Sequence, residues 1–199
     1  MKIIKYNELL EKNNLETIIN IIKNDGVFVY PTDTLYGIGG NFFSRKVIER
    51  IDRIKNRTDM PYSVMISRLT TLEPLVELIP DIFYFYYKDL LPGKYTFLMK
   101  ASSTIPSELL KESKKIGIRI PNVPNILKLL DYLNLPIITT SVNRSGEPSL
   151  NSPEEIIRIF GDSIDFLIDN GTLPVSTGST ILDITENPPR VIRPGDLLS

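Results

Sequence analysis

Apolar residues recur along the chain with two spacings, one typical of helices and one typical of strands. Helical spacing occurs in segments that also carry start or stop signals for a helix. These segments are residues 15–23 before Gly26, a stretch that follows Ser44 and carries Val47, Ile48, Ile51 and Ile54, residues 82–91 before Pro92-Gly93, and residues 124–133. A further helix is predicted to begin at Ser152, an N-cap serine followed by Pro153 and two glutamates.

Short apolar or alternating runs between these segments predict the strands. The runs are residues 27–30, 62–67, 95–100, 116–120, 137–140, 166–168, 179–184 and 190–192. Helices and strands alternate without a strict β-α-β rhythm, and no linker or internal repeat divides the chain. The sequence therefore predicts a single α/β (α+β) domain, residues 1–199, built on a mixed sheet.

Charge and composition remove several classes of function. The chain has 23 basic and 24 acidic residues and a net charge of −1, which argues against binding duplex nucleic acid through bulk positive charge. It has no Cys and no His, so thiol nucleophiles, thiolate metal sites, disulfides and histidine proton shuttles are excluded. Any chemistry must use carboxylates, hydroxyls, Lys, Arg, backbone amides or bound ions.

The apolar runs also bear on location. None approaches the roughly 20 residues of a membrane span. The N-terminal sequence MKIIKYNELLEK lacks the apolar core and the cleavage site of a signal peptide. We therefore expect a cytoplasmic protein that makes no contact with membranes.

Polar residues gather at the ends of the predicted strands. These groups are Thr32-Asp33-Thr34, Lys55-Asn56-Arg57 at the end of the Ser44 helix, Ser141-Val142-Asn143-Arg144-Ser145-Gly146, Ser179-Thr180 and Arg193-Pro194-Gly195. In open α/β sheets, ligands bind in the crevice beyond the strand ends. Cations beside hydroxyls and amides suit a polyanionic ligand such as a nucleoside triphosphate.

Each group also has a purely structural interpretation. Thr32-Asp33-Thr34 is ordinary turn composition, and Lys55 and Arg57 suit the C-terminal end of a helix dipole. Arg119 inside an apolar strand needs a partner, which an ion pair would supply. The aromatic run 84–87 is expected to form a helix face and a core edge rather than a platform for stacking bases.

Familiar catalytic motifs are missing. Gly93-Lys94 does not complete a P-loop, and Gly37-Ile38-Gly39-Gly40 begins a dinucleotide fingerprint whose third glycine is replaced by phenylalanine. There is no G-x-S-x-G, and no serine has a lysine three positions later. A serine acyl-enzyme is therefore not expected.

Taken in order, the polar segments resemble the motifs of the YrdC/TsaC family of threonylcarbamoyl-AMP synthases. Pro31-Thr32-Asp33-Thr34-Leu35-Tyr36-Gly37 resembles P-T-[ED]-T-x-Y-G, Lys55-Asn56-Arg57 resembles K-x-R, residues 91–96 resemble x-P-G-x-x-T, Gly117-Ile118-Arg119-Ile120-Pro121 is similar to V-R-x-P, Ser141–Gly146 resembles S-x-N-x-S-G, Ser179–Asp183 resembles S-T-I-x-D, and Arg193-Pro194-Gly195 resembles R-x-G. The resemblance extends from about residue 20 to the C-terminus.

This resemblance implies a fold and a reaction. The fold would be a YrdC-like twisted sheet of parallel and antiparallel strands, flanked by helices, with a concave groove lined by cations. The reaction would join L-threonine, bicarbonate and ATP into threonylcarbamoyl-AMP and pyrophosphate. A downstream tRNA threonylcarbamoyl transferase complex would then modify the adenosine next to the anticodon. The chain stops soon after Arg193-Pro194-Gly195, as in the short family members without an extra C-terminal domain.

The resemblance also assigns roles to residues. ATP would be bound by Lys55, Arg57, Asn143 and Arg193, and threonine by Thr32, Thr34, Arg119, Ser141 and Ser179, with Arg119 meeting its carboxylate. Lys55, Arg57, Ser141 and Asn143 would form the catalytic group. Mg²⁺ would bind through the ATP phosphates, with no protein residue as a metal ligand.

Some positions depart from the family pattern. Residues 57–61 are one residue shorter than the usual R-P-x-D-x-P and lack its first proline, and Met65 replaces a histidine that some members carry near threonine. Residues 91–100 and 117–121 also resemble the YciO paralogues, a branch that tends to lose the S-x-N element. Two alternatives therefore stay open: a YciO-like paralogue, and a module of the same fold that binds RNA or tRNA weakly without chemistry.

Overall fold

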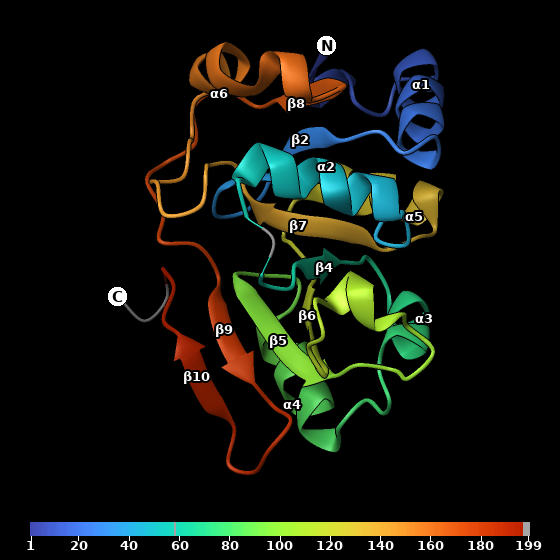
Figure 1. The fold of residues 1–199 in the computed structure, drawn as a ribbon, viewed down its shortest axis with the longest axis vertical. Helices are drawn as coiled ribbons and strands as arrows, with labels where there is room; N and C mark the ends of the chain where they lie inside the picture. Colours follow the sequence, from blue (N-terminus) through green and yellow to red (C-terminus); the bar gives the residue numbers. More distant parts are fainter. Residues whose placement is uncertain (58, 197–199) are drawn as a thin grey trace.

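The described strands of the protein form one mixed sheet. The computed structural model describes residues 1–57 and 59–196, without the side chain of Glu108, so the end of the predicted domain 1–199 and Thr58 lie outside it. The strand order is β1-β8-β2-β3-β7-β4-β6-β5-β9-β10, with parallel and antiparallel neighbours (Figure 1). The prediction of a mixed α/β sheet is confirmed.

The elements have these bounds. The strands are β1 (Lys2–Lys5), β2 (Phe28–Pro31), β3 (Tyr36–Gly39), β4 (Ser63–Met65), β5 (Tyr95–Lys100), β6 (Lys115–Arg119), β7 (Ile137–Ser141), β8 (Phe166–Asp169), β9 (Thr180–Asp183) and β10 (Arg190–Arg193). The α-helices are α1 (Lys12–Lys23), α2 (Arg45–Lys55), α3 (Leu69–Leu72), α4 (Asp81–Leu90), α5 (Pro124–Leu133) and α6 (Pro153–Phe160). Short 3₁₀ turns are η1 (Tyr6–Glu8), η2 (Glu73–Leu75), η3 (Ser107–Leu110) and η4 (Gly161–Ser163).

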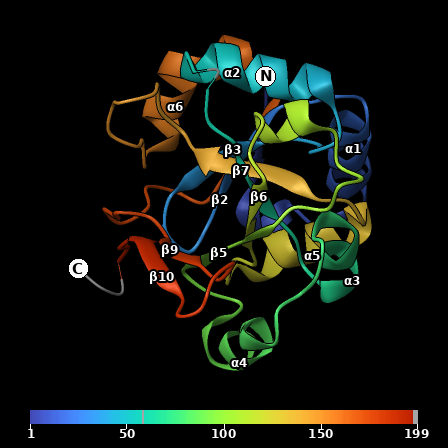
Figure 2. The same cartoon turned by 60° about the horizontal axis from the view of Figure 1, so that its bottom comes forward.

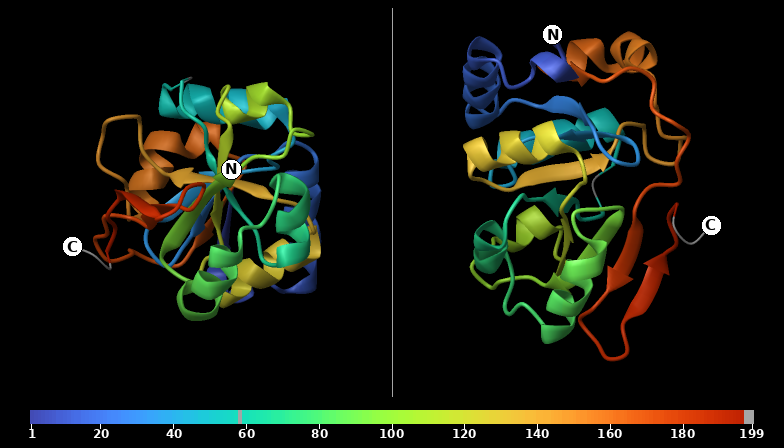
Figure 3. Two further views of the ribbon diagram at one scale, coloured as in Figure 1. Left: turned by 90° about the horizontal axis from the view of Figure 1, so that it is seen from below. Right: turned by 180° about the vertical axis from the view of Figure 1, so that it is seen from behind.

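Apolar residues are buried on both faces of the sheet. In β2, Val29 belongs to one core cluster, whereas Phe28 and Tyr30 belong to the other. Helices α2 and α6 contribute to the first cluster, and α1 and α5 contribute to the second (Figure 3). This explains why β2 reads as a continuous apolar run, since strands buried on both faces show no polar alternation.

The sheet twists strongly along its length. Strands β2 and β7 run nearly horizontally in Figure 1, whereas β5, β9 and β10 slope steeply down the picture. Figure 2 shows β7 running across the view behind β6, which runs in a different direction. Such a twist is the usual right-handed coiling of a large sheet. It brings the ends of strands from the two halves of the sheet toward each other.

No helix among the described residues is long and apolar enough to cross a membrane.

Most predicted elements are present with shifted ends, but two strands were missed. The first helix begins at Lys12, earlier than the predicted residue 15. Strand β1 was missed because K-I-I-K is short and half basic, and β3 because two of its four residues are glycine. Gly39 is required by packing: a Cβ there would lie 1.8 Å from the carbonyl oxygen of Ile138.

The aromatic run 84–87 lies in helix α4 at the edge of the core, as predicted. Phe83 is buried and packs edge-on against Phe97 at a centroid distance of 5.5 Å. Tyr86 and Tyr87 pack partly against the same core. Tyr84 and Phe85 are 44% and 65% exposed, so the core edge of the run 84–87 is formed by Tyr86 and Tyr87. A helix buries one face, and four consecutive residues cannot all lie on it.

Three buried tyrosines predict that the fold loses stability at alkaline pH. Burial raises the pKa of Tyr36 to about 12, and it also raises the pKa values of Tyr30 and Tyr62. The unfolded chain ionises its tyrosines near pH 10. Above that pH the unfolded state binds fewer protons than the folded state, so the free energy of unfolding falls by about 1.4 kcal/mol per pH unit per tyrosine until the folded pKa is reached.

Urea unfolding between about pH 9 and 12, followed alongside tyrosinate absorbance, measures this effect. We expect the unfolding midpoint to fall with pH and part of the tyrosinate signal to appear only on unfolding. Tyr36→Phe should flatten the dependence, whereas Tyr132→Phe, at a position 61% exposed, should not. Ionisation of all tyrosines in one step in the folded protein would contradict the prediction.

Candidate functional site

Strand ends from both halves of the sheet meet around a cavity of about 280 Å³. Its wall comes from the β2–β3 turn, the last residues of β6, β7 and β10, the first residues of β5, the segment before β9, and the chain between α2 and β4. The predicted residues on this wall are Thr32, Arg57, Arg119, Ser141, Ser179 and Arg193. The strand-end groups seen in the sequence are thus brought together in space.

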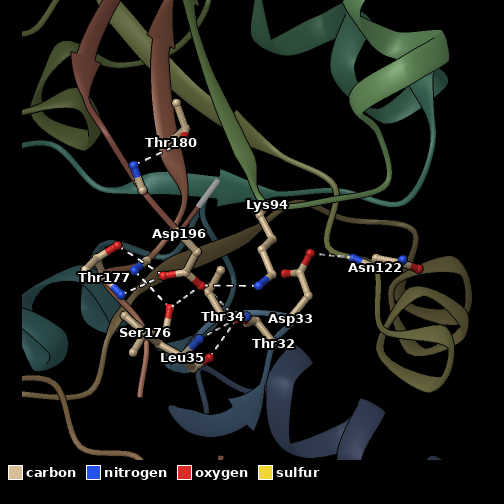
Figure 4. Close-up of polar contacts among 12 residues, drawn as sticks. Thr32, Asp33, Thr34, Leu35, Lys94, Asn122, Ser176, Thr177, Thr180 and Asp196 are labelled. Atoms are coloured by element: carbon tan, nitrogen blue, oxygen red, sulfur yellow. Dashed lines mark hydrogen bonds and ion pairs between the residues drawn. The ribbon is translucent and has the colours of Figure 1, made fainter. Parts of the chain in front are cut away.

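Arg119 is held at the base of the β2–β3 turn. Its Nη2 donates to Asp33 Oδ1 at 2.6 Å, to Thr34 Oγ1 at 2.7 Å and to Thr32 Oγ1 at 3.3 Å. Asp33 also accepts a hydrogen bond from the backbone N–H of Asn122 (Figure 4). The ion pair anticipated for a buried arginine therefore exists, and it uses one end of the guanidinium. Thr34 supports Arg119 rather than lining the cavity.

Arg193 and Ser179 form another part of the wall. Arg193 Nη2 donates to the carbonyl oxygen of Ser179 at 2.9 Å, and the Ser179 hydroxyl is hydrogen-bonded to that of Thr96 at 2.8 Å. Burial lowers the pKa of Arg193, and the nearby Arg119 lowers it further. Two guanidiniums are thus held close enough to repel each other, a cost that an anion between them would remove.

A carboxylate fastens the loop that carries this wall. Asp196 accepts hydrogen bonds from the Ser176 hydroxyl and from the backbone N–H and hydroxyl of Thr177, and it pairs with Lys94 (Figure 4). Although burial would raise the pKa of Asp196, these hydrogen bonds hold it below its usual value. Asp196 therefore fixes the segment that leads into Ser179.

Arg57 reaches the cavity from the end of α2. Asn56 ends that helix in the left-handed conformation, with φ of 50°, and thereby turns the chain. Arg57 Nη2 donates to the carbonyl oxygens of Met60 and Pro61, and the guanidinium lies 5.2 Å from the ring centroid of Tyr62. Tyr62 in turn donates its hydroxyl proton to Asp52 at 2.7 Å. The arginine is thus oriented by its neighbours, and no carboxylate pairs with it in the described chain.

Lys55 and Asn143 lie behind the cavity wall. Lys55 is only 2% exposed, and its Nζ donates to the carbonyl oxygens of Ser141 and Asn143 at 2.6 and 3.2 Å and to Asn143 Oδ1 at 2.8 Å. The Ser141 hydroxyl donates to the same Oδ1 at 2.7 Å. Burial, followed by the charge of Arg57, lowers the pKa of Lys55 to about 8. The predicted phosphate contact of Lys55 is not part of this arrangement.

Two arginines of the cavity wall each have a buried N–H donor without an acceptor. Among the described side chains, the buried nitrogen and oxygen atoms without a hydrogen-bond partner are Nε of Arg57 and Nε of Arg119. Buried donors are nearly always paired, and an unpaired one costs about 1–3 kcal/mol or more when charged. Both arginines line the same cavity, and no described lining residue is acidic. The site is therefore prepared for an anionic acceptor.

Several polar lining residues were missed by the sequence analysis. They are Ser63, Thr96, Thr139, Thr140, Ser149 and Thr177. Thr96 belongs to one of the motifs quoted above but was not assigned a role. Thr139 and Thr140 lie in a strand predicted to be buried, and their place near the C-terminal end of β7 is the one sequence signal that could have identified them as lining residues. Met65 is fully buried in the core and lies outside the cavity.

The described residues also form a second cavity that is larger than the one lined by the predicted residues. A larger cavity of about 690 Å³ lies near the opposite ends of β5 and β6, beside Lys100, Ser102 and Lys115. It contains none of the predicted residues and neither of the unpaired guanidinium nitrogens. The smaller cavity is the better candidate because its polar groups converge. In the described chain no group of three or more acidic side chains could hold a metal ion.

Comparison with known proteins identifies the family of this chain. The family model for Sua5, YciO and YrdC proteins, described as telomere recombination, matches residues 20–195. The chain belongs to the Sua5/YciO/YrdC family. The resemblance drawn from the motifs is thereby confirmed at the level of the family.

Members with different descriptions are about equally similar. The threonylcarbamoyl-AMP synthase of Pyrococcus abyssi is 31% identical over 196 residues, 98% of this chain and 58% of that protein. The uncharacterized protein YciO of Escherichia coli is 32% identical over 179 residues, 89% of this chain and 86% of that protein. The putative threonylcarbamoyl-AMP synthase of Methanocaldococcus jannaschii is 33% identical over 196 residues, 98% of this chain and 92% of that protein. This chain thus spans little more than half of the Pyrococcus relative.

Solved family structures share the fold. The crystal structure of P. abyssi Sua5 complexed with L-threonine superposes with a TM-score of 0.91 at 30% identity, covering 98% of this chain and 58% of that one. The crystal structure of E. coli YciO gives a TM-score of 0.87 at 29% identity, covering 98% and 95%. The YrdC-like mixed fold predicted by resemblance is confirmed.

Proposed function

We propose that the protein is a threonylcarbamoyl-AMP synthase that uses L-threonine, bicarbonate and ATP. The observation that carries the proposal is that Arg57 and Arg119, whose buried Nε–H groups have no hydrogen-bond partner among the described residues, line one cavity of hydroxyls and cations. One anion per arginine matches two of the anionic groups that must meet, the threonine carboxylate and the triphosphate. Relatives named threonylcarbamoyl-AMP synthase support the assignment.

Threonine is assigned to the side of the cavity formed by β6 and the β2–β3 turn. Nη2 of Arg119 donates hydrogen bonds to Asp33 and to the side-chain hydroxyl of Thr34. The rest of the guanidinium is left to bind the carboxylate of the substrate. Thr96 is the cross-strand partner of Arg119, and its hydroxyl is hydrogen-bonded to that of Ser179. Both residues line the cavity, so their hydroxyls can accept from or donate to the substrate hydroxyl. A buried polar wall of this kind selects threonine over apolar amino acids.

The nucleotide is assigned to the side formed by Arg57, Arg193 and Ser141. Guanidiniums bind phosphate oxygens through two parallel hydrogen bonds, and Ser141 lies at the end of β7 where the α-phosphate would sit. A cavity of about 280 Å³ accommodates threonine and the reacting phosphate, so the nucleoside lies at the rim. The described residues offer no cluster of carboxylates for a metal, and in this proposal Mg²⁺ enters as part of the MgATP substrate.

The proposed chemistry needs positioning and charge neutralisation rather than a histidine base. The threonine amine attacks the carbon of bicarbonate, and loss of water leaves a carbamate. A carbamate oxygen then attacks the α-phosphorus of ATP, and the bond between that phosphorus and the bridging oxygen breaks to release pyrophosphate. Arg57 and Arg193 stabilise the charge that develops on the phosphates, and Arg119 and Ser141 orient the acceptor.

The product would serve tRNA modification in the cytoplasm. An acyl adenylate is reactive and must be consumed, so a transferase that moves threonylcarbamoyl to the tRNA adenosine is the expected downstream partner. A YciO-like paralogue and an RNA-binding module remain the alternatives. The Ser141–Asn143 element is intact and hydrogen-bonded here, which favours the synthase over a paralogue that lacks it.

Substrate omission tests the proposal. The protein is incubated with MgATP, L-threonine and bicarbonate, and pyrophosphate and the adenylate are measured, the latter by mass spectrometry. We expect both products only when all three substrates are present. Equal pyrophosphate release without threonine would indicate a different acceptor, and tRNA binding without any adenylate would favour the RNA-binding module.

Arg57→Ala should weaken ATP binding without unfolding the protein. It removes a charge-assisted contact of about 1.5–3 kcal/mol, so the Kd for ATP should rise roughly 10- to 150-fold. The last-turn neighbour Arg53 is exposed and serves as the control, since Arg53→Ala removes the same charge from the helix end. Calorimetry on both variants decides the matter: equal affinities would assign Arg57 to the helix dipole alone.

A further inference from the structure

Lys55 contacts the end of β7 and the loop that follows it, and it does not itself line the cavity. We propose that Lys55 is a positioning residue, which holds the Ser141–Asn143 segment in its active shape, and that it does not bind phosphate. This inference rests on the proposed function for its catalytic consequence. The structural part, the hold on the loop, stands on contacts within the chain.

The ammonium group of Lys55 is fully used. It has three N–H donors and three acceptors within 3.2 Å, namely two backbone carbonyl oxygens and Asn143 Oδ1. The residue is 2% exposed and is absent from the cavity wall, whereas Arg57, two positions later, lies on that wall. A phosphate contact would require Lys55 to give up at least one of these buried hydrogen bonds.

The same residue also holds the far side of the loop. The carbonyl oxygen of Lys55 accepts a hydrogen bond from the backbone N–H of Ser145 at 2.8 Å. The backbone N–H of Val142 donates to the carbonyl oxygen of Tyr36 at 3.2 Å, and this hydrogen bond connects the loop to β3. The segment from Ser141 to Ser145 is therefore fastened at both ends to the last residue of α2.

Lys55 also sets the orientation of the Asn143 amide. Oδ1 receives Lys55 Nζ and the Ser141 hydroxyl, and Nδ2 donates to the carbonyl oxygen of Glu147 at 2.6 Å. A flipped amide would present an NH₂ group to the ammonium, so the flip is excluded. The Ser141 hydroxyl is thereby aimed by a hydrogen bond whose acceptor is itself held by Lys55.

A single neutral substitution tests the hold on the loop without any substrate. Lys55→Met keeps an apolar stem and removes the donors, and Arg53→Met, on the same helix turn but exposed, is the matched control. Hydrogen exchange of the ligand-free variants is measured at the amides of Val142 and Ser145. We expect exchange at least about 10-fold faster in Lys55→Met, with the control unchanged. Unchanged exchange in Lys55→Met would overturn the proposal.

Activity and affinity measurements separate positioning from phosphate binding. With the arginines of the cavity intact, Lys55→Met should change the Kd for ATP by less than about threefold while lowering kcat at least about 100-fold. Loss of a direct phosphate contact would instead weaken ATP binding roughly 10- to 150-fold and leave the ligand-free loop as it is. That result would overturn the proposal.

Wild-type protein provides the test if the variant does not fold. The buried ammonium protons of Lys55 exchange slowly enough for observation by NMR when they are fully hydrogen-bonded. Adding α,β-methylene-ATP should leave their signals in place. Displacement of these signals by the nucleotide would refute the proposal. Because neither this measurement nor the exchange measurement needs turnover, a failure of the synthase assignment stays distinguishable from a failure of this one.

Discussion

Arg119→Met should abolish threonine-dependent adenylate formation and also destabilise the fold. The side chains of Arg119 and Asp33 are 9% and 10% exposed and lie 2.6 Å apart, so removing the cation leaves a buried carboxylate without its partner. Breaking such a pair costs about 3–5 kcal/mol of the free energy of unfolding. Loss of two charge-assisted bonds to the substrate carboxylate should raise the KM for threonine at least about 100-fold.

A second substitution separates the two effects. Asp33→Asn in the Arg119→Met background removes the unpaired charge, and its amide oxygen can still accept from the backbone N–H of Asn122. We expect thermal stability to recover in large part while threonine dependence stays lost. If the double variant recovered threonine binding along with stability, Arg119 would be a structural ion-pair residue and the threonine site would lie elsewhere.

The fold could be predicted from sequence wherever a signal was local. Helix α5 and strand β5 have the predicted bounds, because helical spacing with Pro124 at its start and β-branched alternation need no distant partner. Strand β3 was missed because its glycines exist to admit the ring of Tyr30 and the carbonyl of Ile138. Those contacts come from other strands, and the alternation rule contains no information about them.

The site was predictable by residue type but not by orientation. Lys55 and Arg57 are two positions apart, both basic and both part of one motif, yet only Arg57 faces the cavity. The left-handed conformation of Asn56 separates them, and asparagine is one of the few residues that adopts it readily. Which Nε–H groups remain unpaired depends on the packing of several segments, so no pattern along the chain could identify them.

The order of the strands explains why the polar groups converge. Strand β7 pairs with β3 on one side and β4 on the other, which places Ser141 beside Gly37 at the start of β3. Strand β5 pairs with β6 and β9, so Thr96 lies opposite Arg119 and one step from Thr180. These pairings join residues far apart in sequence, and the polar residues at strand ends are their only sequence-level trace.

Asn143→Leu should eliminate adenylate formation at a moderate cost in stability. Leucine has no acceptor for Lys55 or for the Ser141 hydroxyl, so the α-phosphate loses a correctly aimed group and in-line attack loses its geometry. The buried ammonium loses one of three acceptors, at a cost of about 1–3 kcal/mol, or roughly 2–4 °C of melting temperature per kcal/mol.

Arg144→Leu provides the matched control, because Arg144 is the next residue in the same loop, is exposed, and has no hydrogen bond from its side chain in the described chain. Its melting temperature and adenylate yield should match those of the wild type. A salt titration of tRNA binding on both variants separates the remaining alternative. Binding of the RNA phosphate backbone depends on Lys and Arg side chains. An RNA-binding module would therefore lose affinity for tRNA with Arg144→Leu and keep it with Asn143→Leu. Full adenylate yield from Asn143→Leu would refute the role assigned to the Ser141–Asn143 loop, since no other described side chain holds the Ser141 hydroxyl in its place.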